Sequence, residues 1–96
     1  MTNPYIDSLE EAIEKTHGVK GSYLETVPVT ESFQGKPVWQ GEVEVFIVDH
    51  PKASRVYVWG YQEAGRLKCV AVLGVDPVKG PQEAVKAYLV AQSKAK

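Results

Sequence analysis

The chain has 96 residues, the size of one domain, so residues 1–96 are expected to form a single α+β domain. Its hydrophobic fraction of 44% and charged fraction of 24% are typical of a globular protein, and no apolar run approaches the ~20 residues of a membrane span. One cysteine excludes an intrachain disulfide framework and, with no leader pattern at the start, favours the cytoplasm.

Net charge is −1, but it is unevenly divided between the two halves of the chain. Residues 1–49 carry a balance of −6 and residues 50–96 a balance of +5. Such a division is explained either by charge complementarity within the domain or by a polar surface that meets a partner, which includes a second copy of the chain.

The first predicted element is a helix near the N-terminus. Asn3 before Pro4 is a good helix start, and Ser8 with Glu11 is a capping box, so the helix begins at one or the other. It is expected to end near Gly18. Its apolar stripe consists of Ile6, Leu9, Ala12 and Ile13.

A strand is predicted next, from Ser22 to Phe33, followed by a turn at Gln34-Gly35. Pro28 cannot donate a hydrogen bond to a neighbouring strand, which indicates an edge strand.

Three further strands are predicted over residues 39–49, 55–61 and 66–74, joined by short, turn-rich connections that favour antiparallel hairpins. We assume a register with Val48 opposite Arg55 and Tyr61 opposite Arg66. One face of the sheet is then aliphatic. It carries Val43, Val45, Ile47, Val56, Val58, Gly60, Leu67, Cys69 and Ala71.

In this register, residues that lie side by side across the three strands form rows on the opposite face. Two of these rows place an acid and a base on either side of an aromatic residue, and in one of them Lys68 lies over Trp59. We expect the helices to cover the aliphatic face and leave this aromatic face open as the candidate interaction face. It comprises Glu42, Glu44, Phe46, Tyr57, Trp59, Tyr61, Arg66 and Lys68.

The last element is a helix that opens at Gly80-Pro81, with the stripe Ala84, Val85, Tyr88, Leu89 and Ala91. The predicted fold class is therefore α+β: an antiparallel sheet of three to four strands, with an N-terminal and a C-terminal helix packed on one face.

No residue set predicts catalysis, a metal ion or a cofactor. Cys69 lies mid-strand on the predicted core face, where a thiol acts as a small hydrophobe. His17 is interpreted as a helix-end cation. His50 lies in a turn with Asp49 and Lys52, which leaves open a contact with a ligand or partner.

The order of elements resembles that of double-stranded RNA-binding domains. The resemblance rests on His17-Gly18 at the first helix end, Tyr23–Val27, Gly41–Phe46, and a last helix with Ala84, Ala87 and Ala91. It implies a sheet-and-helices fold, and the position of that family's RNA-contacting lysine cluster corresponds here to Lys79 and the residues after it. Residues 50–53 and 70–73 also resemble segments of small bacterial proteins that have no assigned function.

These observations favour a non-enzymatic domain that associates with itself or with a protein partner. Nucleic-acid binding is the alternative, and the net charge makes it the weaker one because phosphate neutralisation supplies most non-specific affinity. An enzyme or a small-ligand binder ranks third. The alternative phosphate contacts are Lys52, Arg55, Lys79 and Lys86.

Overall fold

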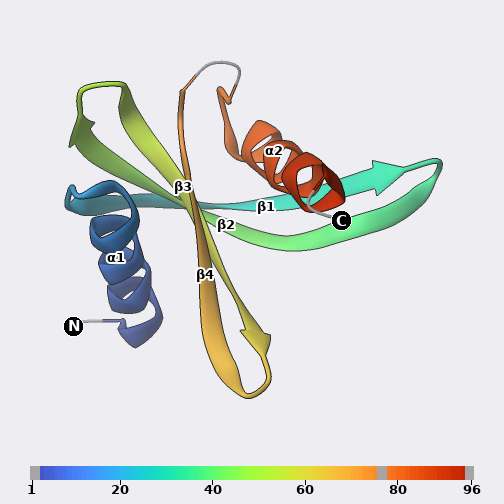
Figure 1. Ribbon diagram of the computed structural model, residues 1–96, viewed down its shortest axis with the longest axis horizontal. Coiled ribbons are helices and arrows are strands. Elements are labelled where there is room, and N and C mark those ends of the chain that lie inside the picture. The colour runs from blue at the N-terminus through green and yellow to red at the C-terminus, as the bar shows by residue number, and fades with distance from the viewer. Residues whose placement is uncertain (1–2, 76–77, 95–96) are drawn as a thin grey trace.

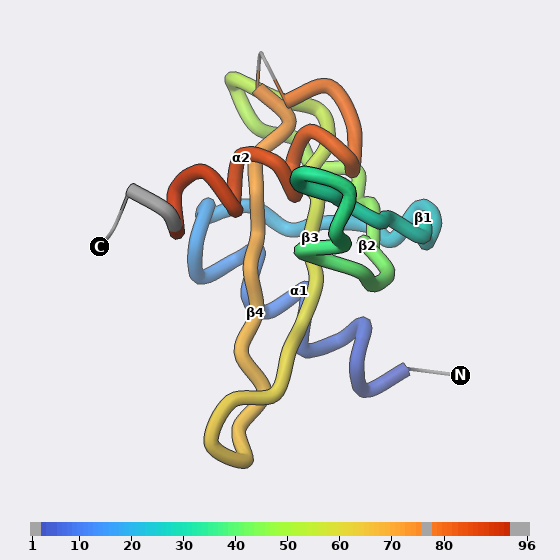
Figure 2. The backbone as a smooth tube through the Cα atoms, turned by 90° about the vertical axis from the view of Figure 1, so that its right-hand side faces the viewer, coloured from blue at the N-terminus to red at the C-terminus, as the bar shows by residue number. Residues whose placement is uncertain are grey.

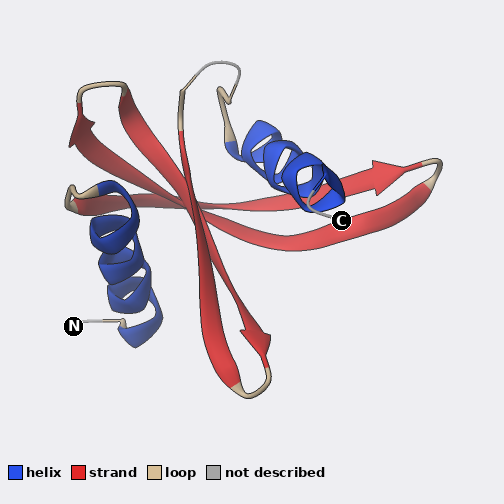
Figure 3. Ribbon diagram, in the orientation of Figure 1, coloured by secondary structure: helices blue, strands red, loops and turns tan. Residues whose placement is uncertain are grey.

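The computed structural model describes residues 3–75 and 78–94. Two helices flank a four-stranded antiparallel sheet of strand order β1-β2-β3-β4, as Figure 3 shows. The α+β class predicted from the sequence is confirmed. No helix in these ranges is both long and apolar enough to cross a membrane. The elements are α1 (Pro4–His17), β1 (Gly21–Phe33), β2 (Lys36–His50), β3 (Ala53–Glu63), β4 (Arg66–Leu73) and α2 (Pro81–Lys94).

Helix α1 begins and ends at residues with defined capping roles. The Asn3 side chain accepts hydrogen bonds from the backbone N–H groups of Tyr5 and Ile6, at 3.0 and 3.4 Å. The Ser8 hydroxyl donates to the Pro4 carbonyl instead, so Asn3 is the N-cap. Gly18, at φ 71°, closes the helix in the left-handed conformation that glycine adopts most easily.

The predicted register between β2 and β3 is correct only at the turn. His50 pairs with Ala53, as expected, but a bulge follows, and beyond it Ile47 rather than Val48 lies opposite Arg55. A bulge sets two residues of one strand against one of its partner. Because side chains alternate with a period of two, this one-residue shift moves the side chains of β2 to the opposite face relative to those of β3.

Between β3 and β4 the shift is two residues. Glu63 pairs with Arg66 and Tyr61 with Lys68, because the turn is a two-residue one at Ala64-Gly65. A shift of two preserves which side chains share a face. The error at the bulge is therefore the one that changes the interpretation of the sheet.

The sheet is made of two hairpins that cross and then separate (Figure 1). β2 pairs with β3 only as far as Glu44 opposite Val58, whereas the β1/β2 ladder continues to Phe33 and the β3/β4 ladder to Glu63. The β3/β4 hairpin accordingly reaches far below the remaining elements (Figure 2). We call the region just beyond the last β2/β3 pair the fork.

The helices cover opposite faces of the sheet, so the prediction that both pack on one face is wrong. Helix α1 packs on a cluster of buried residues that includes Phe46 and Val58, and α2 packs on another that includes Val45 and Trp59. Along β2 and β3, consecutive buried residues alternate between the two helices. The α1 cluster is Leu9, Ile13, Phe46, Val48, Val56 and Val58; the α2 cluster is Val29, Val43, Val45, Tyr57, Trp59, Val78, Ala84 and Val85.

Candidate functional site

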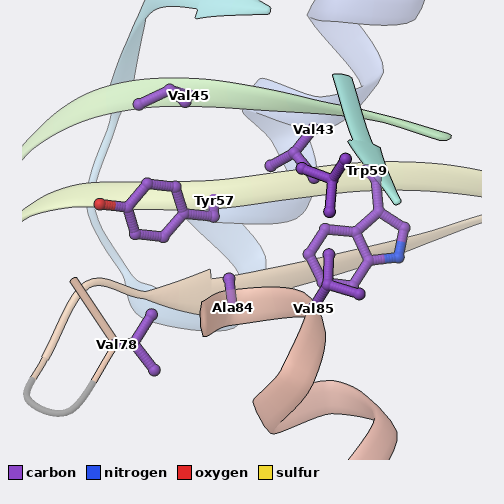
Figure 4. Packing of buried hydrophobic residues seen from close by; sticks show 8 residues of the cluster. Val43, Val45, Tyr57, Trp59, Val78, Ala84 and Val85 are labelled. Carbon is purple, nitrogen blue, oxygen red and sulfur yellow. The ribbon is translucent and has the colours of Figure 1, made fainter. Parts of the chain in front are cut away.

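The aromatic face predicted as an open surface does not exist in the folded chain. Tyr57 and Trp59 are 4% and 2% exposed and lie beneath Ala84 and Val85 of α2 (Figure 4). Phe46, which was expected beside them, is fully buried against α1 on the other face. The aromatic residues therefore belong to two cores.

The predicted rows of acid, aromatic and base do not form either. Lys68 lies opposite Tyr61 rather than Trp59, and Arg66 lies opposite Glu63 at the hairpin tip. Glu44 is buried on the α1 side, two residues before Phe46 in β2. Of the predicted face, Glu42, Tyr61, Arg66 and Lys68 are exposed.

An acidic hollow of about 680 Å³ opens at the fork between α1 and the β1/β2 hairpin. Two of its acids, Asp7 and Glu10, come from α1, and two, Glu42 and Glu44, come from β2. No lysine or arginine of the described chain lines it. The lining residues are Asn3, Tyr5, Ile6, Asp7, Glu10, Tyr23, Thr26, Glu42 and Glu44.

Glu44 is the buried acid of this hollow, only 5% exposed. One carboxylate oxygen accepts a hydrogen bond from the Thr26 hydroxyl, which in turn accepts one from the Tyr23 hydroxyl. Because the Thr26 proton points at the carboxylate, Tyr23 must be the donor to Thr26. Among the side chains that the structure describes, no lysine or arginine lines the hollow beside Glu44, although buried charges are usually paired.

Tyr5 connects α1 to the fork. Its hydroxyl accepts a hydrogen bond of 2.9 Å from the Gly60 N–H, one of the β3 backbone groups beyond the last β2/β3 pair. Burial raises the Tyr5 pKa, the Gly60 hydrogen bond partly offsets that rise, and the charges of Glu44 and Glu42 add to it. The Tyr5 hydroxyl therefore lies within the electrostatic range of both β2 carboxylates of the hollow.

A second, smaller hollow of about 200 Å³ opens at the fork on the α2 side, and we call it the aromatic hollow. Four of its lining residues are aromatic, and they come from three different elements. Glu42 lines both hollows, since it lies where the hairpins separate. The lining residues are Trp39, Gln40, Gly41, Glu42, Trp59, Gly60, Tyr61 and Tyr88.

The rings of the aromatic hollow stand nearly at right angles to one another. Trp59 meets Trp39 at 5.5 Å between ring centroids and 69°, and meets Tyr88 at 5.4 Å and 85°. A Cβ on Gly41 would lie 3.1 Å from the Trp39 ring, so the absent side chain lets the indole fold over the strand. The buried Trp59 indole N–H has no hydrogen-bond partner in the described chain.

Two of the four alternative phosphate contacts come together elsewhere. Arg55 and Lys79 line a hollow of about 410 Å³ beside the start of α2, on the α2 side of the sheet, together with the acid Glu25. Lys52 lies in the β2/β3 turn and Lys86 on the exposed side of α2, and neither lines this hollow.

The histidines and the cysteine have structural contacts. His17 Nε2 lies 3.1 Å from the Ala71 carbonyl and so must donate to it, while His50 Nδ1 accepts from the Lys52 N–H. The two imidazoles meet edge to face at 6.5 Å, a contact that their distance in the sequence gave no sign of. Cys69 borders the α1 core, and burial raises its pKa. In the part of the chain described here, no cluster of three or more ligand side chains could hold a metal ion.

Comparison with known proteins adds no relative: no protein-family model, curated protein or solved structure matches this chain.

Proposed function

We propose that the chain is a protein-interaction domain that binds a basic segment of a partner protein in the acidic hollow. The observation that supports this most is Glu44, a buried carboxylate in a hollow that no lysine or arginine of the described side chains lines. A lysine or arginine side chain from a partner would supply the missing charge in a partly desolvated place, where ion pairs are stronger than at an open surface.

The rim of the hollow supports the same class of partner. Asp7, Glu10 and Glu42 surround Glu44, and a concentration of one charge in a concave site attracts segments of the opposite charge and speeds their association. Tyr5 and Tyr23 add aromatic surface, on which the stems of long basic side chains pack well.

A second copy of this chain is the less favoured occupant. Its Arg55 and Lys79 lie in a hollow on the opposite face of the sheet, so a contact between the acidic hollow of one copy and the basic hollow of another is head to tail. Such contacts generate rings or open chains of subunits rather than a two-fold dimer. A separate protein partner in the cytoplasm, where a lone thiol such as Cys69 stays reduced, is the proposal we favour.

The test is a titration of a fluorescent hexalysine peptide, followed by anisotropy at low and at physiological ionic strength. Glu44→Gln should weaken binding by roughly tenfold or more, since loss of one partner of a buried charge pair costs about 2–5 kcal/mol. Glu44→Gln keeps the shape of the side chain and an oxygen that can accept from Thr26, so circular dichroism should show a folded protein. Mass measurements across protein concentration detect self-association.

Asp49→Asn is the matched control, since it changes the net charge equally at an exposed position near the β2/β3 turn. It should leave peptide affinity unchanged. If Glu44→Gln and Asp49→Asn weaken binding to the same degree, net charge alone attracts the peptide, and the acidic hollow is not a binding site.

Nucleic-acid binding is the second candidate, favoured by the meeting of Arg55 and Lys79 in one hollow and by the resemblance to double-stranded RNA-binding domains. Duplex RNA bound at or below about 1 μM at physiological salt, tighter than the usual non-specific range, would promote this candidate. Arg55→Gln should then reduce the slope of log affinity against log salt by about one.

A further inference from the structure

The aromatic hollow is built as a cage. Its walls are Trp39 from β2, Trp59 and Tyr61 from β3, and Tyr88 from α2, and its floor includes the two glycines at the fork. Trp59 is buried between Trp39 and Tyr88, so the aromatic surface that a ligand can reach comes from the partly buried Trp39 and Tyr88 and the exposed Tyr61. At about 200 Å³ the hollow is smaller than pockets of ~300–1,000 Å³ for drug-sized ligands, so it suits a compact headgroup.

No cation of the described chain fills this cage. Lys68 was expected over Trp59 but lies opposite Tyr61, and the lysines and arginines of the described ranges are absent from its lining. The only charged lining residue is Glu42, an exposed carboxylate. Aromatic faces are the negative part of a ring's quadrupole, so rings and carboxylate favour the same sign of ligand.

Packing alone leaves one group of this cage unsatisfied. The Trp59 indole N–H is buried without an acceptor in the described chain, whereas buried indole N–H groups usually find one. Trp39 meanwhile packs against the edge of the α2 core and folds over Gly41, and it remains only partly buried. The partial burial of Trp39 leaves part of its ring accessible from the hollow. An acceptor for the Trp59 N–H would have to come from another part of a ligand, because an alkylated ammonium nitrogen has none.

We propose that the aromatic hollow binds an alkylated ammonium group, such as a trimethylammonium headgroup, with Glu42 at its rim as the counter-charge. Methylation is the chemical feature that the cage selects. An unmodified lysine ammonium is compact and strongly hydrated, whereas methyl groups on nitrogen spread the charge over apolar surface that can contact ring faces. The group comes either from a free small molecule or from a methylated lysine of a protein.

This inference does not depend on the acidic hollow. Apart from Glu42 and the adjoining backbone, the two hollows have different walls on different faces of the sheet. Trp39→Ala should leave hexalysine affinity unchanged, and Glu44→Gln should leave alkylammonium affinity unchanged. The failure of one proposal is therefore distinguishable from the failure of the other.

Tryptophan fluorescence is a direct readout, because both tryptophans of the chain line the cage. We would titrate the protein with choline chloride at constant ionic strength and, in parallel, with 3,3-dimethylbutan-1-ol, the neutral carbon isostere of choline. Choline should produce a saturable change in emission and the alcohol none. A third arm compares a short peptide carrying trimethyllysine with the same peptide unmodified, and tighter binding of the methylated peptide than of choline would identify a protein source.

Variants separate the cage from general effects. Trp39→Ala should weaken choline binding about tenfold, the scale of a desolvated cation–π contact, with Trp59 still reporting. Glu42→Gln should weaken it by a smaller factor. Phe33→Ala is the matched control, since it removes an exposed aromatic ring at the tip of the same hairpin and should change nothing.

Two results would overturn the proposal. One is equal affinity for choline and its neutral isostere, which would make the hollow an ordinary apolar pocket. The other is the absence of any saturable response up to about 10 mM choline in a protein whose circular dichroism shows that it is folded. If the Trp39→Ala variant does not fold, Glu42→Gln still tests the proposal. It leaves all four aromatic rings of the hollow in place and must weaken choline binding.

Discussion

The indole of Trp59 lies between the rings of Trp39 and Tyr88 beneath α2, and it is 2% exposed. Trp59→Ala is therefore expected to destabilise the fold by about 3–5 kcal/mol, because truncation of a buried aromatic loses transfer free energy and leaves a cavity. Val90→Ala, at a position on α2 that is 52% exposed, should stay within about 0.5 kcal/mol of wild type. Urea unfolding followed by circular dichroism measures both. Similar midpoints for the two variants would mean that Trp59 is not part of the core.

At the scale of the elements, the turns contain strain that a single substitution can relieve. Ala64 has φ 53° and Gly65 φ 76°, the pair of left-handed conformations found in the hairpin turns that favour Asn-Gly. Ala64→Asn should stabilise the protein by up to about 1 kcal/mol, which for a domain of this size raises Tm by roughly 4–8 °C. Ala64→Val should lower Tm, because a β-branched side chain is strained at positive φ. If both substitutions shift Tm in the same direction, the β3/β4 turn does not have this geometry.

The elements themselves were predictable because their signals are local. Asn3-Pro4 and Gly18 mark the ends of α1, Gln34-Gly35 marks the first turn, and Gly80-Pro81 the start of α2, each by a chemistry that acts within a few residues. The positions of the helices on the sheet were not predictable in this way. They depend on the bulge between Ile47 and His50. This bulge inserts one extra residue into β2, and no local sequence pattern indicates it.

The candidate sites were missed for the same reason. Glu42, Glu44, Trp59 and Tyr61 were singled out from the sequence, but one misplaced residue assigned them to a single open face. Trp39 and Tyr88 complete the aromatic hollow from elements far apart in the chain, and only the crossing of the hairpins brings them together. The one available signal was the apolar stripe of α2, which contains Tyr88 and needs a sheet face to cover.

At the scale of the whole molecule, the sheet joins two half-cores that share the same strands. Along β3, Val56 and Val58 pack on the α1 side while Tyr57 and Trp59 pack on the α2 side, so neither half-core can lose its helix without exposing strands on which the other depends. We therefore expect the protein to unfold as one cooperative unit.

Leu9→Ala tests this coupling from the side that carries no tryptophan. Leu9 is a fully buried residue of α1 that faces the sheet, so its truncation should cost about 2–5 kcal/mol. In a cooperative unit the cost appears equally in the urea transition of tryptophan fluorescence, which reports on the α2 side, and in that of circular dichroism, which reports on all elements. Glu14→Ala, at an exposed position of the same helix, should shift neither by more than about 0.5 kcal/mol. If Leu9→Ala moved the circular dichroism transition but left the fluorescence transition in place, the α2 half-core would be stable by itself and the shared strands would not couple the two faces.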